Sequence, residues 1–239
     1  MLVATYNVHR CRPPAGLFRP DRIEGVIAEI RPDLIALQEA QHYLRRGTGM
    51  LDAGRLQREL GLRLLQVTGR AGEQGWRSNL LLARQDVTLL HGPVGLRLGG
   101  WEPRGAILAV LDLGAGPLRV ISTHLSLGAR RRRLQAAALL EAMEGAPGRR
   151  LPTLLLGDFN EWRSGRSALG VLETVFGDPP HPPGFPSFFP RLALDRILAD
   201  PPALAPRVEA HDTPLARRAS DHLPLKARLD TTVLAGRAG

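Results

Sequence analysis

The chain has 239 residues, of which 44% are hydrophobic and 23% are charged, and its formal net charge is +9. These proportions are those of an ordinary soluble protein. No apolar run approaches the roughly 20 residues that a membrane-spanning helix requires, so a transmembrane segment is not expected.

The cysteine count and the net charge indicate the cellular compartment and the class of substrate. The lone cysteine, Cys11, cannot form an internal disulfide bond and fits a reducing compartment. The first residues lack the basic and long apolar regions of a secretory signal, and a cytoplasmic location is therefore expected. Except for Lys226, every basic side chain is an arginine. The positive charge favours polyanions in general, and it permits a phosphate-bearing substrate without identifying nucleic acid.

Hydrophobic periodicity predicts a chain rich in both strands and helices. Short apolar runs between turn residues predict strands, and apolar residues at helical spacing predict helices. The predicted strands are residues 2–8, 33–39, 62–67, 78–84, 87–91, 105–113, 118–124, 151–156, 192–198, 206–211 and a last strand ending near Leu229. The predicted helices are residues 20–30, 53–60, 127–144 and 168–176.

Two of these helices have predicted inward faces. The positions expected to face the core are Leu134, Ala138, Leu139 and Ala142 in the first, and Leu169, Leu172, Val175 and Phe176 in the second. The run of arginines at 130–133 is expected to be a solvated face, with one arginine turned toward an anionic substrate.

The remaining segments are predicted loops. Residues 178–186 contain too many prolines for regular structure, and His181 within them is expected to be exposed. The turns at 69–76 and 99–104 each hold a tryptophan near an arginine, which either caps the edge of a core or reaches a substrate. The tail, residues 231–239, is expected to fray.

Polar side chains stand at the ends of several predicted strands. Each of them alone has an ordinary explanation, such as closing a turn or capping a helix. Together they supply carboxylates for a hard divalent cation, amides for phosphate oxygens and histidines for proton transfer. This set consists of Asn7, Glu39, His124, Asp158, Asn160, Asp195, Asp221 and His222.

Other common catalytic motifs are missing from the sequence. There is no Gly-rich phosphate loop, no His-Glu-x-x-His, no cysteine cluster and no Gly-x-Ser-x-Gly. The usual nucleotide-binding, zinc-protease and serine-hydrolase assignments are therefore excluded.

The polar motifs and their order resemble those of the endonuclease/exonuclease/phosphatase superfamily of metal-dependent phosphoesterases. The matching pieces are Thr-Tyr-Asn-Val-His at 5–9, Leu-Gln-Glu at 37–39, Ser-Thr-His-Leu at 122–125, Gly-Asp-Phe-Asn at 157–160, Leu-Asp-Arg-Ile at 194–197 and Ser-Asp-His at 220–222. The resemblance implies an α/β (α+β) fold, namely a four-layer α/β/β/α sandwich of two mainly antiparallel sheets flanked by helices. It also implies one catalytic domain over residues 1–230.

The resemblance further implies a metal site and a water-activating pair. Glu39 would be the principal ligand of Mg²⁺, with Mn²⁺ as an alternative, and Asp221 would support the metal or its network. Asn7 would hold a water or a phosphate oxygen nearby. Asp158 and Asn160 would position and activate the attacking water.

The two histidines would contact the phosphate. His222, oriented by Asp195, would touch the scissile phosphate and handle a proton, and His124 would contact the phosphate or the leaving group. The resemblance leaves open whether Asp158 or His222 is the base. Some nucleases of the superfamily have a carboxylate where this chain has His9, and its absence favours a single-metal site.

The expected reaction is hydrolysis of a phosphodiester by in-line attack of water. The substrate is a phosphate ester, whether a phospholipid, another small phosphodiester or nucleic acid, with weak additional contacts from Arg104, Arg77 and Trp162. A DNA or RNA nuclease is the alternative, which the positive charge favours and the scarcity of aromatic side chains opposes. A phosphomonoesterase and a non-catalytic binding module are less favoured.

Overall fold

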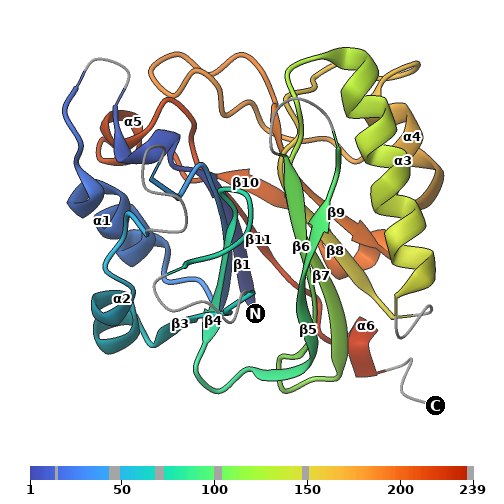
Figure 1. The fold of residues 1–239 in the computed structure, drawn as a ribbon, viewed down its shortest axis with the longest axis horizontal. Helices are drawn as coiled ribbons and strands as arrows, with labels where there is room; N and C mark the ends of the chain where they lie inside the picture. Colours follow the sequence, from blue (N-terminus) through green and yellow to red (C-terminus); the bar gives the residue numbers. More distant parts are fainter. Residues whose placement is uncertain (14–15, 43–48, 68–72, 100–103, 147–150, 236–239) are drawn as a thin grey trace.

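The computed structural model describes residues 1–239 except 14–15, 43–48, 68–72, 100–103, 147–150 and 236–239. Two sheets face each other across the middle of the molecule (Figure 1). The six-stranded sheet contains, in spatial order, β10 (Val208–Ala210), β11 (Leu225–Arg228), β1 (Leu2–Asn7), β2 (Leu34–Gln38), β4 (Leu80–Arg84) and β3 (Leu62–Leu64). The five-stranded sheet contains β5 (Thr88–Arg97), β6 (Gly105–Asp112), β7 (Pro117–His124), β8 (Thr153–Asp158) and β9 (Asp195–Asp200).

Helices cover the outer faces of both sheets. The helices α1 (Pro20–Ile30), α2 (Ala53–Leu60) and α5 (Ala216–Ala219) lie outside the six-stranded sheet, and α3 (Ala129–Gly145) and α4 (Ala168–Phe176) lie outside the other (Figure 1). Two 3₁₀ turns, η1 (His9–Cys11) and η2 (Pro202–Leu204), and a last helix, α6 (Thr232–Ala235), complete the described elements. The predicted four-layer sandwich is confirmed, and no helix in the described ranges is long and apolar enough to span a membrane.

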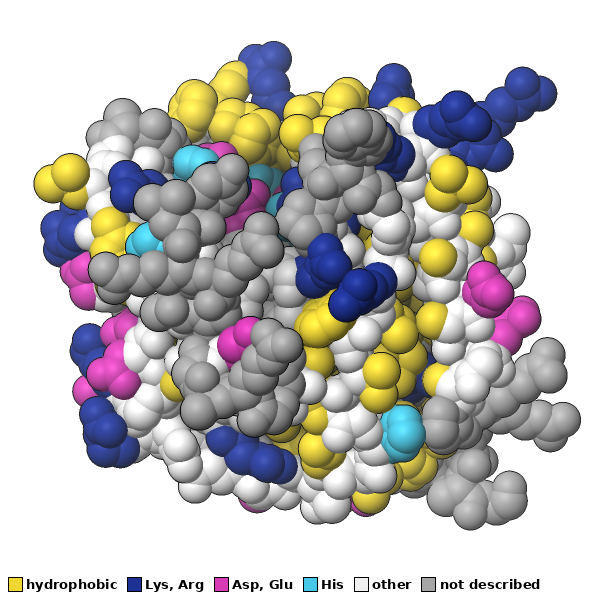
Figure 2. Space-filling view, in the orientation of Figure 1, with side chains coloured by type: hydrophobic (Ala, Val, Ile, Leu, Met, Phe, Trp, Pro, Cys, Tyr) yellow, Lys and Arg dark blue, Asp and Glu magenta, His cyan; other side chains and the backbone are white. Residues whose placement is uncertain are grey.

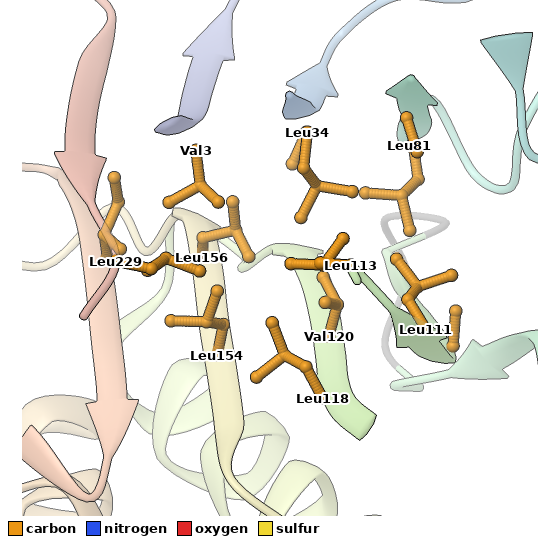
Figure 3. Close-up of a cluster of buried hydrophobic side chains, with 14 of the residues drawn as sticks. Val3, Leu34, Leu81, Leu111, Leu113, Leu118, Val120, Leu154, Leu156 and Leu229 are labelled. Carbon is orange, nitrogen blue, oxygen red and sulfur yellow. The ribbon is translucent and has the colours of Figure 1, made fainter. Parts of the chain in front are cut away.

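The central core fills the space between the sheets. Val3, Leu34 and Leu81 from one sheet meet Leu154 and Leu156 from the other (Figure 3). Because side chains alternate along a strand, neighbouring residues such as Leu155 face the outer helices instead. Strands buried on both faces explain why the sequence shows continuous apolar runs rather than alternation.

The antiparallel pairs dominate, but one parallel pair in each sheet decides where functional side chains gather. In one sheet β1 pairs in parallel with β2, and Asn7 lies opposite Gln38. In the other β7 pairs in parallel with β8, and His124 lies opposite Asp158. The carboxyl ends of strands in a parallel pair lie at the same edge of their sheet.

The predicted inward face of α3 is partly wrong. Leu134 is 65% exposed, and the buried positions are Arg132, Gln135, Ala136, Leu139 and Met143. The helix is rotated because Arg132 donates to the buried carboxylate of Glu161 at 2.8 Å. The arginine run is thus not uniformly solvated.

Three smaller predictions also need correction. Val175 of α4 is 38% exposed, whereas Leu172 and Phe176 are buried as expected. His181 is only partly exposed, because its Nε2 accepts a hydrogen bond from the Ile197 amide at 3.1 Å. The tail does not fray throughout: α6 forms there, and Leu234 packs into the central core. Residues 236–239 lie outside the described residues.

Candidate active site

The strand registers bring the predicted polar residues to one end of the sheets. Glu39 follows β2 directly, next to the pair of Asn7 and Gln38. In the second sheet Asp158 lies between His124 on β7 and Asp195 on the antiparallel strand β9. The site therefore joins the edges of two different sheets.

Asn7 connects the two sheets through its side-chain amide. Its Nδ2 donates to Asp158 Oδ2 at 2.8 Å and lies 3.5 Å from Glu39 Oε1. The carbonyl of Asn7 accepts a hydrogen bond of 2.7 Å from Ser220 Oγ, which ties in the loop before Asp221. Asn7 is almost fully buried, so these contacts fix its position.

His222 and Asp195 form a buried pair. Asp195 Oδ2 lies 2.7 Å from His222 Nδ1, and His222 Nε2 points toward Asp158, 3.9 Å from its Oδ2. Burial favours the neutral imidazole, but the negative charges of Asp195 and Asp158 outweigh it and raise the pKa of His222 to about 10. Phe185 packs against the ring with a centroid distance of 4.8 Å. His222 is therefore an oriented cation at neutral pH.

His124, in contrast to His222, is neutral at neutral pH. Burial lowers its pKa to about 3, with Asp158 opposing this shift and Arg104 reinforcing it. Arg104 Nη1 lies within 2.9 Å of both ring nitrogens, and Asn160 Nδ2 lies 3.1 Å from Nε2. Both groups are donors, and the neutral imidazole can accept from them through its unprotonated ring nitrogen without carrying charge.

Asp158 lies at the centre of the cluster. Burial raises its pKa, although His124, His222 and the hydrogen bond from Asn7 favour the carboxylate. Its Oδ1 accepts a hydrogen bond of 2.8 Å from the amide of Asn160. A buried carboxylate with a raised pKa is suited to taking a proton from water.

Two site residues have a left-handed backbone. The φ angle is 54° at Glu39, directly after β2, and 51° at Asn160, two residues after the end of β8. This conformation is unfavourable for residues with a Cβ, by roughly 1–2 kcal/mol for each residue. Such strain is typical of functional positions, and here it turns both side chains back toward the cluster.

Comparisons with known proteins agree with this geometry. The model of the Endonuclease/Exonuclease/phosphatase family matches residues 4–222. The chain belongs to this family. Uncharacterized protein YbhP of Escherichia coli (strain K12) is 32% identical over 167 residues, which are 65% of this chain and 64% of that protein. The chain thus spans less than two thirds of the length of this relative.

Solved structures of the family share the fold. The endonuclease/exonuclease/phosphatase from Bacteroides vulgatus has a TM-score of 0.72 and 20% identity, covering 96% of this chain and 98% of that chain. Mannosyl-6-phosphatase Bt3783 of Bacteroides thetaiotaomicron has a TM-score of 0.69 and 19% identity, covering 96% and 99%. Family members include metal-dependent phosphoesterases, nucleases and phosphatases, and the match establishes the family of this chain and its fold.

The donor set fits a divalent metal. Among the described residues, Asp158, Asp195 and His222 offer ligand atoms within 4.8 Å of one another, and Asp195 Oδ1 is buried without a hydrogen-bond partner. The side chains of Glu39 and Asp221 are 20% and 23% exposed and add carboxylate oxygens. Carboxylate oxygens are preferred by Mg²⁺, whereas Asp195 is already engaged with His222.

The contacts connect Glu39 and Asp221 to the same residue, Asn7. Asp221 Oδ1 lies 3.4 Å from Ser220 Oγ, the hydroxyl bonded to Asn7. It also lies 3.6 Å from His9 Nδ1, and the amide of His9 donates to Asn7 Oδ1 at 3.0 Å. The assignment of Glu39 and Asp221 as metal ligands stays a prediction.

The three weaker substrate-contact predictions differ in their surroundings. Arg104 touches His124, within the cluster. Arg77 lies 5.8 Å from the centroid of the Trp76 ring, and Trp162 is 48% exposed. Trp76 packs at the edge of the core and donates to the Leu96 carbonyl at 2.9 Å, which favours the capping role for this tryptophan. Residues 69–72 and 101 lie outside the described residues.

Several supporting residues were missed from the sequence. Ser220 and Phe185 hold Asn7 and His222, and the Arg132–Glu161 pair holds the loops after His124 and Asn160. The role of Ser220 could have been suspected from the sequence, because Ser220 directly precedes Asp221 and His222. No sequence pattern indicates the role of Phe185, since its contact with His222 depends on the path of a proline-rich loop.

Proposed function

We propose that the protein hydrolyses a phosphodiester by in-line attack of water, with a divalent metal held by Glu39 and Asp221 and with Asn7 holding a water or a phosphate oxygen beside it. The observation that supports this most is the chain of contacts from Asp195 through His222 and Asp158 to Asn7. It places an oriented cation, a buried carboxylate and an amide around one point. These groups match the needs of phosphoryl transfer, namely charge neutralisation and an activated nucleophile.

Asp158 acts as the base in this proposal. Its Oδ1 and Oδ2 are held by Asn160 and Asn7, so the carboxylate is fixed before a water binds. His222 carries its proton at neutral pH and cannot accept another, which favours Asp158 over His222 in this role. Asn160 orients the water through its side-chain amide.

Positive and neutral donors bind the phosphoryl oxygens. His222 offers Nε2–H, while Asp195 fixes its ring through Nδ1. Arg104 and the neutral His124 supply further hydrogen bonds on the other side of Asp158. When bound, the metal would supply Lewis-acid stabilisation of the charge that develops on the phosphoryl group.

A chromogenic diester tests the proposal. Wild-type protein with Mg²⁺ should hydrolyse bis-p-nitrophenyl phosphate faster than the monoester p-nitrophenyl phosphate, and chelator should abolish both reactions. Faster turnover of the monoester would show that the protein is a phosphomonoesterase rather than a phosphodiesterase. No hydrolysis of either compound, together with ligand binding at the cleft, would support a binding module.

A nuclease is the second candidate, which the net charge of +9 favours. The test is cleavage of plasmid DNA and RNA beside a phospholipid substrate, with binding measured at low and moderate salt. Steep loss of affinity with salt, accompanied by cleavage, would support the nuclease. A single catalytic domain over residues 1–230 and a cytoplasmic location remain predictions.

A further inference from the structure

The end of the molecule that carries the site exposes large apolar side chains. Leu17 is 81% exposed, Leu127 66%, Phe188 64%, Phe189 54% and Trp162 48%. We call the surface formed by these five residues the mouth face. In Figure 2, apolar side chains gather at the top of the view, above recessed acidic and histidine side chains, and arginines project beyond them.

The chain positions of these residues place them beside the catalytic cluster. Leu127 follows His124 by three residues, and Trp162 follows Asn160 by two. The loop that carries Phe188 is bonded to the loop of the site, because the Ser187 amide donates to the Asp221 carbonyl at 2.7 Å. Leu127, Trp162 and Phe188 therefore lie on loops that adjoin the site.

An arginine-lined groove with a cavity volume of about 480 Å³ lies on the α1 and α5 side of the mouth face. Leu17 and Phe188 line it together with Arg19, Arg22, Arg217 and Arg218. Arg19 and Arg217 are paired with Asp21 and Asp212, but no acidic side chain belongs to the described lining.

A second groove, of about 520 Å³, lies between the first halves of α3 and α4, which start just after the two site loops. Its lining includes the apolar Leu134 and Val171 together with Arg130, Arg133 and Arg166. Both flanks of the site therefore combine apolar surface with positive charge.

We propose that the mouth face binds the surface of an anionic phospholipid bilayer, so that the phosphoester entering the site is a lipid headgroup. This rests on the proposed function and gives its substrate class. Apolar side chains between arginines match the boundary between acyl chains and anionic headgroups. Contiguous exposed apolar surface with a charged rim is typical of an interaction site.

The two leucines of the face favour lipid over nucleic acid. Leu17 and Leu127 offer no aromatic face on which a base can stack, yet they insert readily among acyl chains. Two of the aromatic residues are amphipathic units: Arg191 lies 4.3 Å above the Phe189 ring and Arg163 lies 5.0 Å above the Trp162 ring. Such pairs place an apolar ring in the interface while the guanidinium remains at headgroup level.

Vesicle flotation in chelator tests binding without any hydrolysis. Wild-type protein should float with vesicles of phosphatidylglycerol and phosphatidylcholine and remain behind with vesicles of phosphatidylcholine alone. The variant L17S/L127S/F188S should bind the anionic vesicles at least about tenfold more weakly, because each apolar side chain loses its burial. The matched control is L90S, since Leu90 is 52% exposed on β5 at the opposite end of the sheet.

Arginine variants test the electrostatic contribution to vesicle binding. R133Q and R166Q should each weaken binding to anionic vesicles about fivefold. R207Q is the matched control, because Arg207 is 83% exposed and lies next to β10, away from the site. Added salt should reduce the difference between the arginine variants and wild type.

Hydrolysis separates this proposal from the function on which it rests. L17S/L127S/F188S should keep wild-type turnover of bis-p-nitrophenyl phosphate and lose turnover of vesicle-borne phospholipid. Equal binding by wild type and this variant, or preferential binding of single-stranded DNA that the substitutions do not affect, would overturn the lipid assignment. Vesicle binding without turnover of any diester would instead overturn the proposed function alone.

Discussion

Asn7 shows why one residue type is needed at the centre of the site. Its amide nitrogen faces Asp158 Oδ2 at 2.8 Å and Glu39 Oε1 at 3.5 Å, while its Oδ1 accepts from the His9 amide at 3.0 Å. An aspartate at this position would turn a donor into a third carboxylate and repel both neighbours. The amide lies between the two carboxylates and donates to one of them, which reduces the repulsion between these side chains.

Loss of a central side chain should reduce turnover far more than it reduces stability. The single variants Glu39→Ala, Asp158→Ala and His222→Ala should each lower kcat by about two to four orders of magnitude. The measurement is hydrolysis of bis-p-nitrophenyl phosphate with Mg²⁺, with circular dichroism as the check on folding. Asp86→Ala is the control, because Asp86 is an exposed carboxylate beyond the other end of β4. Near-full activity of Asp158→Ala would refute its role as the base.

The Asp195–His222 pair predicts a change in the pH profile. In Asp195→Asn the negative charge beside His222 is lost, and the pKa of His222 should fall from about 10. The decline of kcat/KM at alkaline pH should therefore begin at a lower pH than in wild type. A merely structural role for Asp195 would lower activity without moving this limb, so an unshifted profile would contradict the assignment.

The same shift has a consequence for stability. The folded pKa of His222, about 10, lies above its ordinary value of 6.5. The pair therefore stabilises the fold fully below about pH 6.5, and this contribution is lost as the pH rises through about 10. The free energy of unfolding of Asp195→Asn should depend less on pH within this window.

At the scale of residues, the sequence predicted the strand-end side chains Asp158 and His124 but not the surroundings of His181, which lies in a loop. Asp158 and His124 could be predicted because their strands end in recognisable apolar runs. His181 was expected to be exposed, but the path of its loop brings it to the Ile197 amide. No local pattern encodes that path, since the partners are 16 residues apart.

At the scale of elements, a buried ion pair connects the two loops that carry the site. Arg132 of α3 donates to Glu161 Oε2 at 2.8 Å and also to the Leu127 carbonyl. Burial raises the pKa of Glu161, but hydrogen bonds from Arg132 and Arg163 outweigh it and lower the pKa below its usual value. Asn160 directly precedes Glu161, so the pair holds the water-positioning residue against α3.

Breaking this pair should cost more than breaking an exposed one. Arg132→Met should lower the free energy of unfolding by about 3 kcal/mol, because the buried carboxylate of Glu161 then keeps only Arg163 and two backbone amides as partners. Glu161→Gln should lower it by a similar amount, because the buried Arg132 loses its counter-charge. The combined variant Arg132→Met/Glu161→Met should lose less than the sum of the single changes. Urea unfolding measures these values, and kcat/KM should fall up to about 100-fold through misplacement of Asn160.

The exposed pair of Arg217 and Asp212 provides the control. Their side chains are 44% and 41% exposed, and Arg217→Met should change the free energy of unfolding far less than Arg132→Met. Strict additivity of the two single changes at Arg132 and Glu161 would show that the pair does not act as a unit.

The same pair explains why the face of α3 was predicted wrongly. Periodicity assigned Leu134 to the core because it is apolar, and it assigned the arginines to solvent because they are charged. The buried carboxylate of Glu161 reverses both assignments by drawing Arg132 inward. A partner on another element cannot be read from the helix itself.

At the scale of the whole molecule, the fold brings distant segments together because two parallel strand pairs end at one edge. Residues as far apart as Asn7 and Asp158 are neighbours only through the face-to-face packing of two sheets. Composition and periodicity predicted strands and helices but not their pairing order. The layered architecture came from the resemblance of the motifs to a known family, and the two facing sheets confirm it, whereas the strand order could be read only from the structure.

Gathering several carboxylates at one edge predicts that a metal stabilises the whole fold as well as supporting turnover. Chelator should abolish hydrolysis, and Mg²⁺ should restore it. A metal that binds only the folded state adds about 2.7 kcal/mol when its concentration is 100 times Kd, so Mg²⁺ should raise the Tm of wild type. In Glu39→Gln this rise should largely disappear, while the Tm in chelator should equal or exceed that of wild type because one charge is removed from the cluster.

Glu141→Gln, on the exposed side of α3, should respond like wild type. Full activity in chelator, or an undiminished rise in the Tm of Glu39→Gln, would contradict the metal site at Glu39.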